Sequence, residues 1–230
     1  MADRPYTLLS CSMSIDGYLD YGTDERLLLS NDADLDRVDA VRATCDAILV
    51  GAATVRNDNP RLVIRAQSRC DERVARGLPP SPIKVTVTCL GKLDVCANFF
   101  VTGDSEKLVY CASETAAEAR EQLGSVATVV DGGQPVSMWR MSEDLHARGV
   151  RRLMVEGGGS MHTQFLTADL ADELQLVVAP FFVGESRARR FVDAGRFPWN
   201  PDRRATLADV RRIDDVVLLR YALSTRFQND

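Results

Sequence analysis

The chain has 230 residues, of which 45% are hydrophobic and 27% are charged, and its formal net charge is −5. This composition is typical of a globular protein with one buried core. The acidic balance excludes a general basic surface for nucleic acid, and the chain lacks a run of roughly 20 apolar residues that could cross a membrane. Six cysteines are scattered without a Cys-x-x-Cys pair, so we expect no metal site. We therefore expect a soluble cytoplasmic enzyme without a nucleic-acid or membrane partner.

Strands and helices are predicted to alternate along the chain. Short apolar or alternating runs indicate the strands, and apolar residues three or four apart indicate the helices. The predicted strands are 6–14, 47–50, 83–89, 108–111, 126–130, 152–155, 173–179, 208–213 and 216–222. The predicted helices are 32–44, 113–123, 137–148 and the stretch from 160 to about 170. This order predicts a single α/β domain over 1–230, with three layers, a mainly parallel sheet and an antiparallel C-terminal hairpin.

Residues with known capping preferences set the predicted helix boundaries. Asn31 or Ser30 is expected to cap the first helix, Ser113 to cap the second, and Gly149 to end the third. The apolar face of the first helix is predicted to consist of Leu35, Val38 and Val41. Residues 66–82 contain one glycine and three prolines and are expected to form a flexible loop.

The strongest local signal is a run of glycines after a predicted strand. Strand 152–155 leads into Glu156, then into glycines 157–159, and a helix follows from Ser160. Consecutive glycines let backbone amides approach a ligand closely, and the N–H groups at a helix start attract an anion such as phosphate. Glu156 would lie at the carboxyl end of its strand, where open α/β sheets bind ligands. A tight turn without a ligand is the alternative interpretation.

A second polar segment, 51–65, follows another predicted strand. Thr54 and Asp58 are four residues apart and would share one face of a helical turn, which Asn59-Pro60 would end. A capped surface loop is the alternative for this segment alone, but two polar segments at strand ends favour a shared cleft. The other polar features are His146, His162 and the basic run 187–190. We interpret them as structural or solvent-exposed.

Taken together, these segments resemble the reductase domain of the bacterial riboflavin-pathway deaminase/reductase, whose fold is similar to that of dihydrofolate reductase. The resemblance rests on the turn at 14–17, the segment 54–65, the glycines after Glu156 and the stretch 170–180. It implies NADPH-dependent reduction of a phosphoribosylaminopyrimidine, as in a 5-amino-6-(5-phosphoribosylamino)uracil reductase, with hydride transfer turning the ribosyl unit into a ribityl chain. It also implies a homodimer, for which the C-terminal hairpin is a candidate interface.

The resemblance assigns roles to individual residues. Cofactor contacts are expected at Ser12, Thr54, Asp58, Gly157, Gly158, Gly159, Ser160 and Met161. Substrate contacts are expected at Arg42, Leu62, Arg65 and Glu156, and either arginine could hold the 5′-phosphate with two parallel hydrogen bonds. Glu156 and Asp58 are the candidate catalytic residues. Glu156 either hydrogen-bonds the pyrimidine amino groups or helps to move a proton.

The sequence departs from the family pattern at three places. Arg26 and Leu28 stand where the family has a Ser and a Trp facing substrate and cofactor, and Ser12 stands where a family enzyme has a Gly. The motifs of the zinc deaminase half are absent from these residues, so we expect a reductase that leaves deamination to another protein. The alternatives are a reductase of the same fold that acts on another acceptor such as dihydrofolate, and a non-catalytic nucleotide-binding protein.

Overall fold

The computed structural model describes residues 3–23, 25 and 27–228, which form two compact units. Unit 1 consists of Val38–Met154 with the short stretch that ends at Pro5, and unit 2 consists of Tyr6–Arg37 with the residues from Val155 onward. Helix α1 (Asp32–Ala43) carries the chain from unit 2 into unit 1, and strand β6 (Arg152–Gly157) carries it back.

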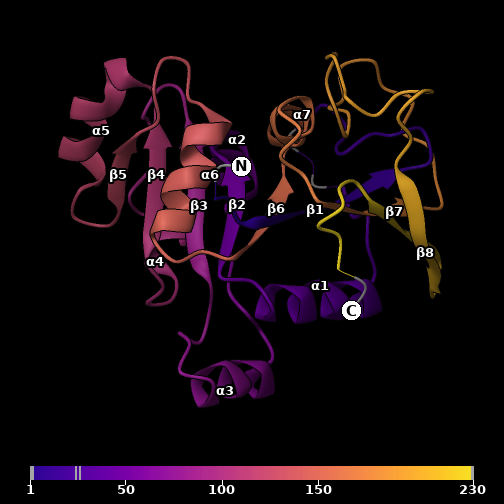
Figure 1. The fold of residues 1–230 in the computed structure, drawn as a ribbon, viewed down its shortest axis with the longest axis horizontal. Coiled ribbons are helices and arrows are strands. Elements are labelled where there is room, and N and C mark those ends of the chain that lie inside the picture. Colours follow the sequence, from indigo (N-terminus) through magenta and orange to yellow (C-terminus); the bar gives the residue numbers. More distant parts are fainter. Residues whose placement is uncertain (1–2, 24, 26, 229–230) are drawn as a thin grey trace. The chain divides into compact units, whose positions relative to one another are not determined.

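Unit 1 is built on parallel strands in the order β5-β4-β3-β2. The strands are β2 (Ala47–Gly51), β3 (Ile83–Thr88), β4 (Lys107–Cys111) and β5 (Thr128–Asp131), and Figure 1 shows them side by side. The helices of the unit are α2 (Ala52–Asp58), α3 (Gln67–Ala75), α4 (Asn98–Val101), α5 (Ala116–Leu123) and α6 (Met138–Ala147). Every residue of β2 is buried, which explains why this strand reads as a continuous apolar run in the sequence.

Helices cover both faces of the strands of unit 1. On one face the core cluster includes Ile48, Val50, Val55, Phe99, Phe100, Val109 and Leu123, which come from β2, β4, α2, α4 and α5. Tyr110, the next residue along β4, faces the other way because successive side chains of a strand alternate. Its hydroxyl donates a 2.6 Å hydrogen bond to Asp144 of α6. Unit 1 therefore has the three layers that the sequence predicts.

Unit 2 contains the antiparallel part of the fold. Its strands, in the order β1-β7-β9-β8, are β1 (Tyr6–Ser14), β7 (Glu173–Ala179), β9 (Val216–Ala222) and β8 (Thr206–Ile213). β1 pairs with β7 in parallel, whereas β9 pairs with both β7 and β8 in antiparallel fashion. Its helix α7 (Gly159–Thr167) follows β6. The predicted α/β class with an antiparallel C-terminal hairpin is confirmed.

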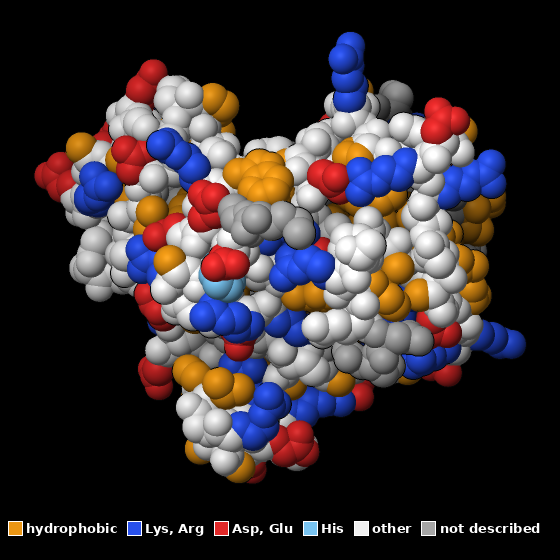
Figure 2. Space-filling model, viewed as in Figure 1, with side chains coloured by type: hydrophobic (Ala, Val, Ile, Leu, Met, Phe, Trp, Pro, Cys, Tyr) orange, Lys and Arg blue, Asp and Glu red, His pale blue; other side chains and the backbone are white. Residues whose placement is uncertain are grey.

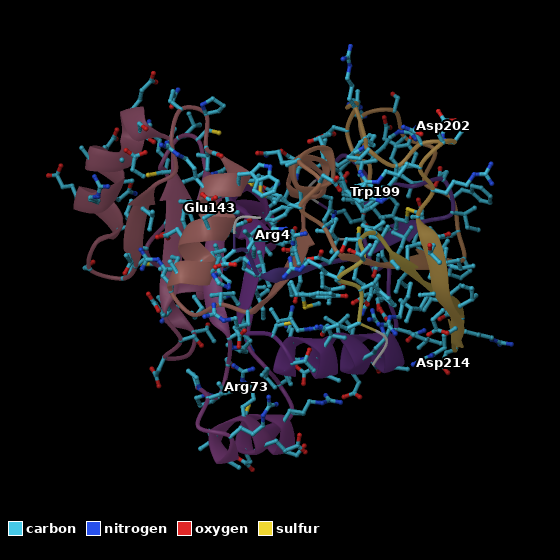
Figure 3. The ribbon with its side chains drawn as sticks, viewed as in Figure 1. Arg4, Arg73, Glu143, Trp199, Asp202 and Asp214 are labelled. Atoms are coloured by element: carbon cyan, nitrogen blue, oxygen red, sulfur yellow. The ribbon has the colours of Figure 1, made fainter. Side chains whose placement is uncertain are left out.

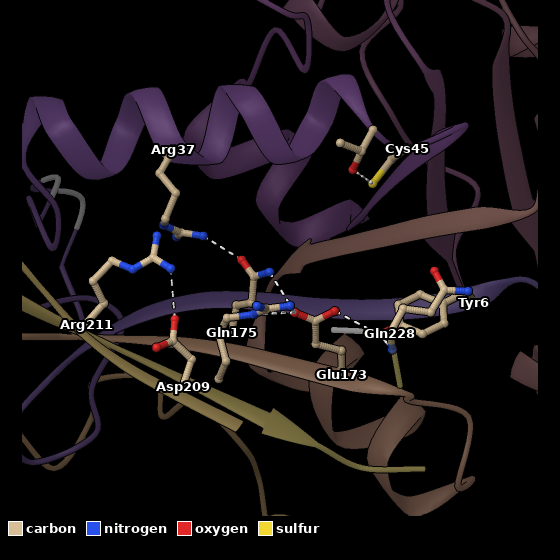
Figure 4. A network of polar contacts seen from close by, with 10 residues as sticks. Tyr6, Arg37, Cys45, Glu173, Gln175, Asp209, Arg211 and Gln228 are labelled. Carbon is tan, nitrogen blue, oxygen red and sulfur yellow. Dashed lines mark hydrogen bonds and ion pairs between the residues drawn. The ribbon is translucent and has the colours of Figure 1, made fainter. Parts of the chain in front are cut away.

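A buried polar network lies at the amino end of β7. The Glu173 carboxylate is fully buried and accepts hydrogen bonds from the Tyr6 hydroxyl at 2.8 Å, from Gln175 Nε2 at 2.8 Å and from Arg220 Nε at 3.0 Å. Gln175 in turn accepts a hydrogen bond from Arg37, as Figure 4 shows. A buried carboxylate is tolerated only when it is paired and hydrogen-bonded, so this network joins β1, β7, β9 and α1.

Two local predictions are wrong, and one helix was missed. Residues 66–82 are not a loop throughout, because α3 occupies Gln67–Ala75. Its buried Arg73, labelled in Figure 3, donates to the carbonyl oxygens of Ala43, Cys45 and Pro79 at 2.8–2.9 Å. Ser113 does not cap a helix, since its hydroxyl donates to Asp131 at 2.7 Å and a short 3-10 turn precedes α5. The short helix α4 was not predicted.

The first helix is capped as predicted, but its buried face is not the predicted one. The Asn31 side chain accepts a 2.9 Å hydrogen bond from the Asp34 amide, which confirms Asn31 as a cap. The predicted apolar face, which consists of Leu35, Val38 and Val41, is only half-buried. The fully buried side chains of α1 include those of Asp34 and Asp39, at 0% and 2% exposure. Both carboxylates are hydrogen-bonded, which makes their burial possible.

The surface carries charges of both signs. Figure 2 shows basic side chains in blue and acidic side chains in red interspersed over the visible face, in keeping with the net charge of −5. Among the helices formed by the described residues, none has the length and apolar character that a membrane crossing requires.

Candidate functional site

The predicted site residues are divided between the two units. Unit 1 contains Arg42, Thr54, Asp58, Leu62 and Arg65. Unit 2 contains Ser12, Glu156, Gly157, Gly158, Gly159, Ser160 and Met161. Of the two family departures near the first helix, Arg26 lies outside the described residues, and Leu28 is 67% exposed.

The glycine run forms the turn between β6 and α7. Gly157 has a φ of +150°, which favours glycine, and the peptide bond between Gly157 and Gly158 is cis. Gly158 is the N-cap of α7, and its carbonyl oxygen accepts hydrogen bonds from the amides of Met161 at 2.8 Å and His162 at 3.2 Å. The preceding amides of the first turn have no acceptor within the helix, because an α-helix leaves its first N–H groups unpaired. This end of α7 therefore suits an anionic ligand.

Positions 157, 158 and 159 differ in whether the protein itself requires glycine there. A Cβ atom on Gly159 would run into the carbonyl oxygen of Arg190, so this glycine is required by the protein's own backbone. Gly157 is required by its φ. Gly158 has φ −80° and ψ −175°, an extended conformation that any residue adopts. Backbone conformation therefore does not require glycine at 158, and a substitution there is the informative test for a ligand.

The side chains of the first turn of α7 divide into core and surface. His162 is fully buried, and its ring centroid lies 5.4 Å from that of Phe191. Burial lowers the pKa of His162 to about 4, so its ring is neutral at physiological pH, which agrees with its interpretation as structural. Met161 is also buried, whereas Ser160 is exposed and accepts a 3.2 Å hydrogen bond from Gln164. A ligand at this turn would therefore meet the Ser160 hydroxyl and backbone amides.

Ser12 and Glu156 are both half-buried and lie toward the ends of their strands. Ser12 is opposite Val177 in the pairing of β1 with β7. Glu156 is the penultimate residue of β6, directly before the glycine turn. The position of Glu156 agrees with the strand-end placement that the sequence predicts.

Asp16 is a structural residue that the sequence analysis assigned only to a turn. Its carboxylate accepts hydrogen bonds from the Ser14 hydroxyl at 2.6 Å, the Val183 amide at 3.1 Å and the Gly184 amide at 2.8 Å. Desolvation raises the pKa of Asp16, but these hydrogen bonds outweigh that effect and hold it below its usual value. Asp16 thus ties the loop after β1 to the loop after β7. The latter loop runs on to Arg190, whose carbonyl oxygen lies against Gly159 at the start of α7. The Asp-Gly pair after a strand was the only signal for it.

The second predicted segment begins with a short helix, as expected. Thr54 is half-buried and Asp58 is exposed, and both lie on α2, four residues apart on one face. The helix ends at Asp58 because Asn59 takes a left-handed conformation, with φ 44° and ψ 52°. Asn59 therefore directs the chain into the stretch that contains Leu62 and Arg65.

The side chains of the predicted substrate residues differ in their exposure to solvent. Leu62 is only 2% exposed and packs in the core of unit 1, so a ligand could reach its backbone but not its side chain. The Arg65 side chain is 55% exposed, and its Nε lies 3.8 Å from a carboxylate oxygen of Asp39. Arg42 is half-buried and donates from Nη1 to the carbonyl oxygen of Val63 at 3.2 Å. Of the two predicted phosphate ligands, Arg65 presents the more exposed guanidinium.

A separate cleft of about 340 Å³ lies in unit 1, where β4 and β5 meet α6. Its lining includes Tyr110, Ser113, Asp131, Arg140 and Asp144. None of the predicted site residues of unit 1 lines it.

The chain matches a known family along most of its length. The RibD C-terminal domain family matches residues 5–219. A 2,5-diamino-6-ribosylamino-4(3H)-pyrimidinone 5′-phosphate reductase of Archaeoglobus fulgidus is 34% identical over 183 residues, which cover 79% of this chain and 83% of that protein. A protein of the same name from Methanothermobacter thermautotrophicus is 35% identical over 192 residues, covering 83% and 84%.

Solved structures agree with the fold. A pyrimidine reductase-like protein from Corynebacterium diphtheriae has a TM-score of 0.79 at 22% identity, covering 95% of this chain and 91% of that one. The riboflavin biosynthesis reductase Rib7 of Saccharomyces cerevisiae has a TM-score of 0.67 at 20% identity, covering 96% and 90%. These likenesses confirm the predicted reductase-domain fold. The chain therefore belongs to the RibD C-terminal domain family.

Proposed function

We propose that this protein is an NADPH-dependent reductase of riboflavin biosynthesis, which converts the ribosyl unit of a phosphorylated ribosylaminopyrimidine into a ribityl chain. The observation that carries the proposal is the 34–35% identity to two archaeal reductases over most of both chains. Both relatives are named for the 2,5-diamino compound. We therefore place the undeaminated pyrimidinone ahead of the aminouracil that the sequence alone suggests.

The turn before α7 suits the pyrophosphate of a dinucleotide. Gly158 has no side chain, and the first amides of α7 and the exposed Ser160 hydroxyl are hydrogen-bond donors at the positive end of the helix dipole. We assign Ser12, Thr54, Asp58 and the backbone of Met161 to further cofactor contacts. When bound, NADPH supplies the hydride for the reduction.

The substrate residues are assigned by chemistry and exposure. Arg65 binds the 5′-phosphate, because a guanidinium matches phosphate with paired hydrogen bonds and this side chain is 55% exposed. Arg42 supports the segment that contains Leu62, through its bond to the Val63 carbonyl. Glu156 hydrogen-bonds the pyrimidine amino groups or passes the proton that accompanies the hydride. The whole of 1–230 serves as one reductase domain, in keeping with the family match over 5–219.

A homodimer and a cytoplasmic location complete the proposal. Strand β8 is eight residues long and pairs with β9. Two of its apolar side chains are exposed, Leu207 to 51% and Val210 to 56%. An exposed apolar edge strand is a template for another chain, and a second copy of β8 would cover it. The six cysteines are free thiols, which is the state that a reducing cytoplasm maintains.

The test follows the absorbance of the reduced nicotinamide with three acceptors in parallel. These are the diaminopyrimidinone ribosyl phosphate, its deaminated counterpart and dihydrofolate. We expect turnover of the first compound and slower or no turnover of the second. Turnover of dihydrofolate alone would favour the reductase with another acceptor. Cofactor binding without any turnover would favour the non-catalytic nucleotide-binding protein.

A further inference from the structure

The segment between α2 and α3, residues 59–66, is fixed to the rest of unit 1 at its start. The Asn59 side chain accepts a 2.7 Å hydrogen bond from the Asn98 amide at the start of α4, and the Asn98 side chain donates back to the Asn59 carbonyl at 3.2 Å. Leu62 then adopts a φ of +48° and buries its side chain in the core. The positive φ of Leu62 costs free energy that the burial of its side chain offsets.

The end of the same segment is held by side chains from other elements. The Ile64 amide donates to the Ser81 hydroxyl at 3.1 Å. The Asp39 carboxylate of α1 accepts from the Arg65 amide at 2.7 Å and from the Ala66 amide at 3.1 Å. The backbone N–H groups of residues 64–66 therefore each have an acceptor, and each oxygen of the Asp39 carboxylate accepts one of these hydrogen bonds.

Asp39 is itself held in place. It is 2% exposed, and Arg69 of α3 donates to its Oδ2 at 2.9 Å. Burial raises the pKa of Asp39, but the two amides and Arg69 outweigh that effect and lower it, so the carboxylate is charged at neutral pH. The anion lies beside the first residues of α3, where the helix dipole also favours it.

Asp39 fixes the backbone of Arg65 and lies 3.8 Å from its Nε, and the Arg65 side chain as a whole stays 55% exposed. A long side chain on an immobilised backbone loses less conformational freedom on binding than one on a mobile loop. We propose that Asp39 is a positioning residue that presents Arg65 to the phosphate of the substrate. This inference rests on the proposed function, because it needs a phosphorylated substrate that Arg65 contacts.

The test is a double-mutant cycle between Asp39→Asn and Arg65→Ala, with KM and kcat measured for the ribosyl phosphate substrate and for its dephosphorylated form. In Asp39→Asn one oxygen becomes an amide that cannot accept, so one of the two backbone N–H groups loses its partner. We expect KM for the phosphorylated substrate to rise about tenfold, the equivalent of one charge-assisted hydrogen bond, with kcat within about twofold. KM for the dephosphorylated form and for NADPH should stay unchanged.

The cycle separates positioning from a general loss of structure. If Asp39 acts through Arg65, adding Asp39→Asn to Arg65→Ala should raise KM by less than about twofold. A full tenfold rise in that background, or an equal rise for the dephosphorylated substrate, would overturn the inference. Asp34→Asn is the matched control, because Asp34 is another buried carboxylate of α1 that pairs with Ser30 and Arg37 and does not bind the segment. It should leave KM unchanged.

Two further measurements keep the inference testable. If Asp39→Asn does not fold, Arg69→Met removes only the side chain that orients the carboxylate, and we expect about a threefold rise in KM; an unchanged KM would count against the inference. If the wild type reduces no phosphorylated pyrimidine, the proposed function fails, and calorimetric binding of ribose 5-phosphate replaces KM. Weaker binding by both Asp39→Asn and Arg65→Ala would then support the positioning role. Equal binding by wild type and Asp39→Asn, or no binding by the wild type, would refute it.

Discussion

Lys84 gives the protein a stability that should depend on pH in the alkaline range. This lysine lies on β3 and is fully buried, and its Nζ donates hydrogen bonds to the carbonyl oxygens of Phe99 at 3.1 Å and Thr102 at 2.6 Å. Phe99 lies on α4 and Thr102 directly follows that helix, whose Asn98 also holds Asn59. Burial, followed by repulsion from Lys107, lowers the pKa of Lys84 from 10.5 to about 8.

The sign and size of the effect follow from that shift. Between pH 8 and 10.5 the unfolded chain keeps the proton of Lys84 and the folded protein releases it. The free energy of unfolding should therefore rise with pH in this window, by at most about 1.4 kcal/mol per unit. The total gain in the free energy of unfolding is about 3 kcal/mol. It is present in full above the pKa of Lys84 in the unfolded chain, and it is lost as the pH falls through the pKa of Lys84 in the folded protein.

The assay is urea unfolding of wild type and Lys84→Met in reducing buffer. It is repeated at steps from about pH 7 to about pH 10.5, so that the series spans the range in which Lys84 is protonated in the unfolded chain only. Subtracting the two unfolding free energies at each pH removes the titration of all other groups. The difference should favour the wild type increasingly as the pH rises. Lys92→Met, which changes an exposed lysine, should give a flat difference. A flat difference for Lys84→Met would refute the argument that burial destabilises the charged form.

Four other predictions test the site and the fold. Gly158→Val should abolish NADPH binding, measured by nicotinamide fluorescence, because the φ and ψ of residue 158 are open to valine but its side chain would occupy the place assigned to the pyrophosphate. Unchanged affinity would contradict the glycine-turn assignment. Arg65→Ala should raise KM for the phosphorylated substrate about tenfold, since an exposed charge is partly screened by water, and an unaltered KM would remove it from the site. Glu173→Ala should cost about 3–5 kcal/mol in urea unfolding, because it leaves Arg220, only 12% exposed, without its carboxylate; a cost below about 1 kcal/mol would contradict the role of the network. Val210→Lys should convert a dimer into a monomer in light scattering, and an unchanged mass would exclude the β8 edge as the interface.

The strands were predictable because most are short apolar or alternating runs bounded by polar or turn-forming residues. The helix α3 was not, since its sequence QSRCDERVA is mostly polar and its buried side chain is that of Arg73. Its attachment comes from Arg73, which binds the carbonyl oxygens of Ala43 and Cys45. Those partners lie 30 and 28 residues earlier, so no local pattern indicates them.

The candidate site was predictable only where its chemistry is local. Glycines directly after a strand can be recognised from adjacent residues, and so can two polar residues four apart on a short helix. Asp39 and Asp16 act on backbone amides 26 and 167 residues away, and such contacts leave no trace in the neighbouring sequence. For Asp39 a weaker signal exists, because an acidic residue four positions after Leu35 falls near the predicted apolar face of the helix.

The pairing of β1 with β7 has a consequence for synthesis on the ribosome. Leu8 of β1 pairs opposite Glu173 of β7, and the Thr7 amide binds Asp172, 165 residues later. At about 5–20 residues per second, β1 leaves the ribosome on the order of ten seconds before its β7 partner exists. Unit 1 lies almost wholly within Val38–Met154, so most of its strand pairs can form during that interval. Nascent chains that stop before β7 would keep the apolar residues of β1 without this partner, and chaperones that bind extended apolar segments would find their target there.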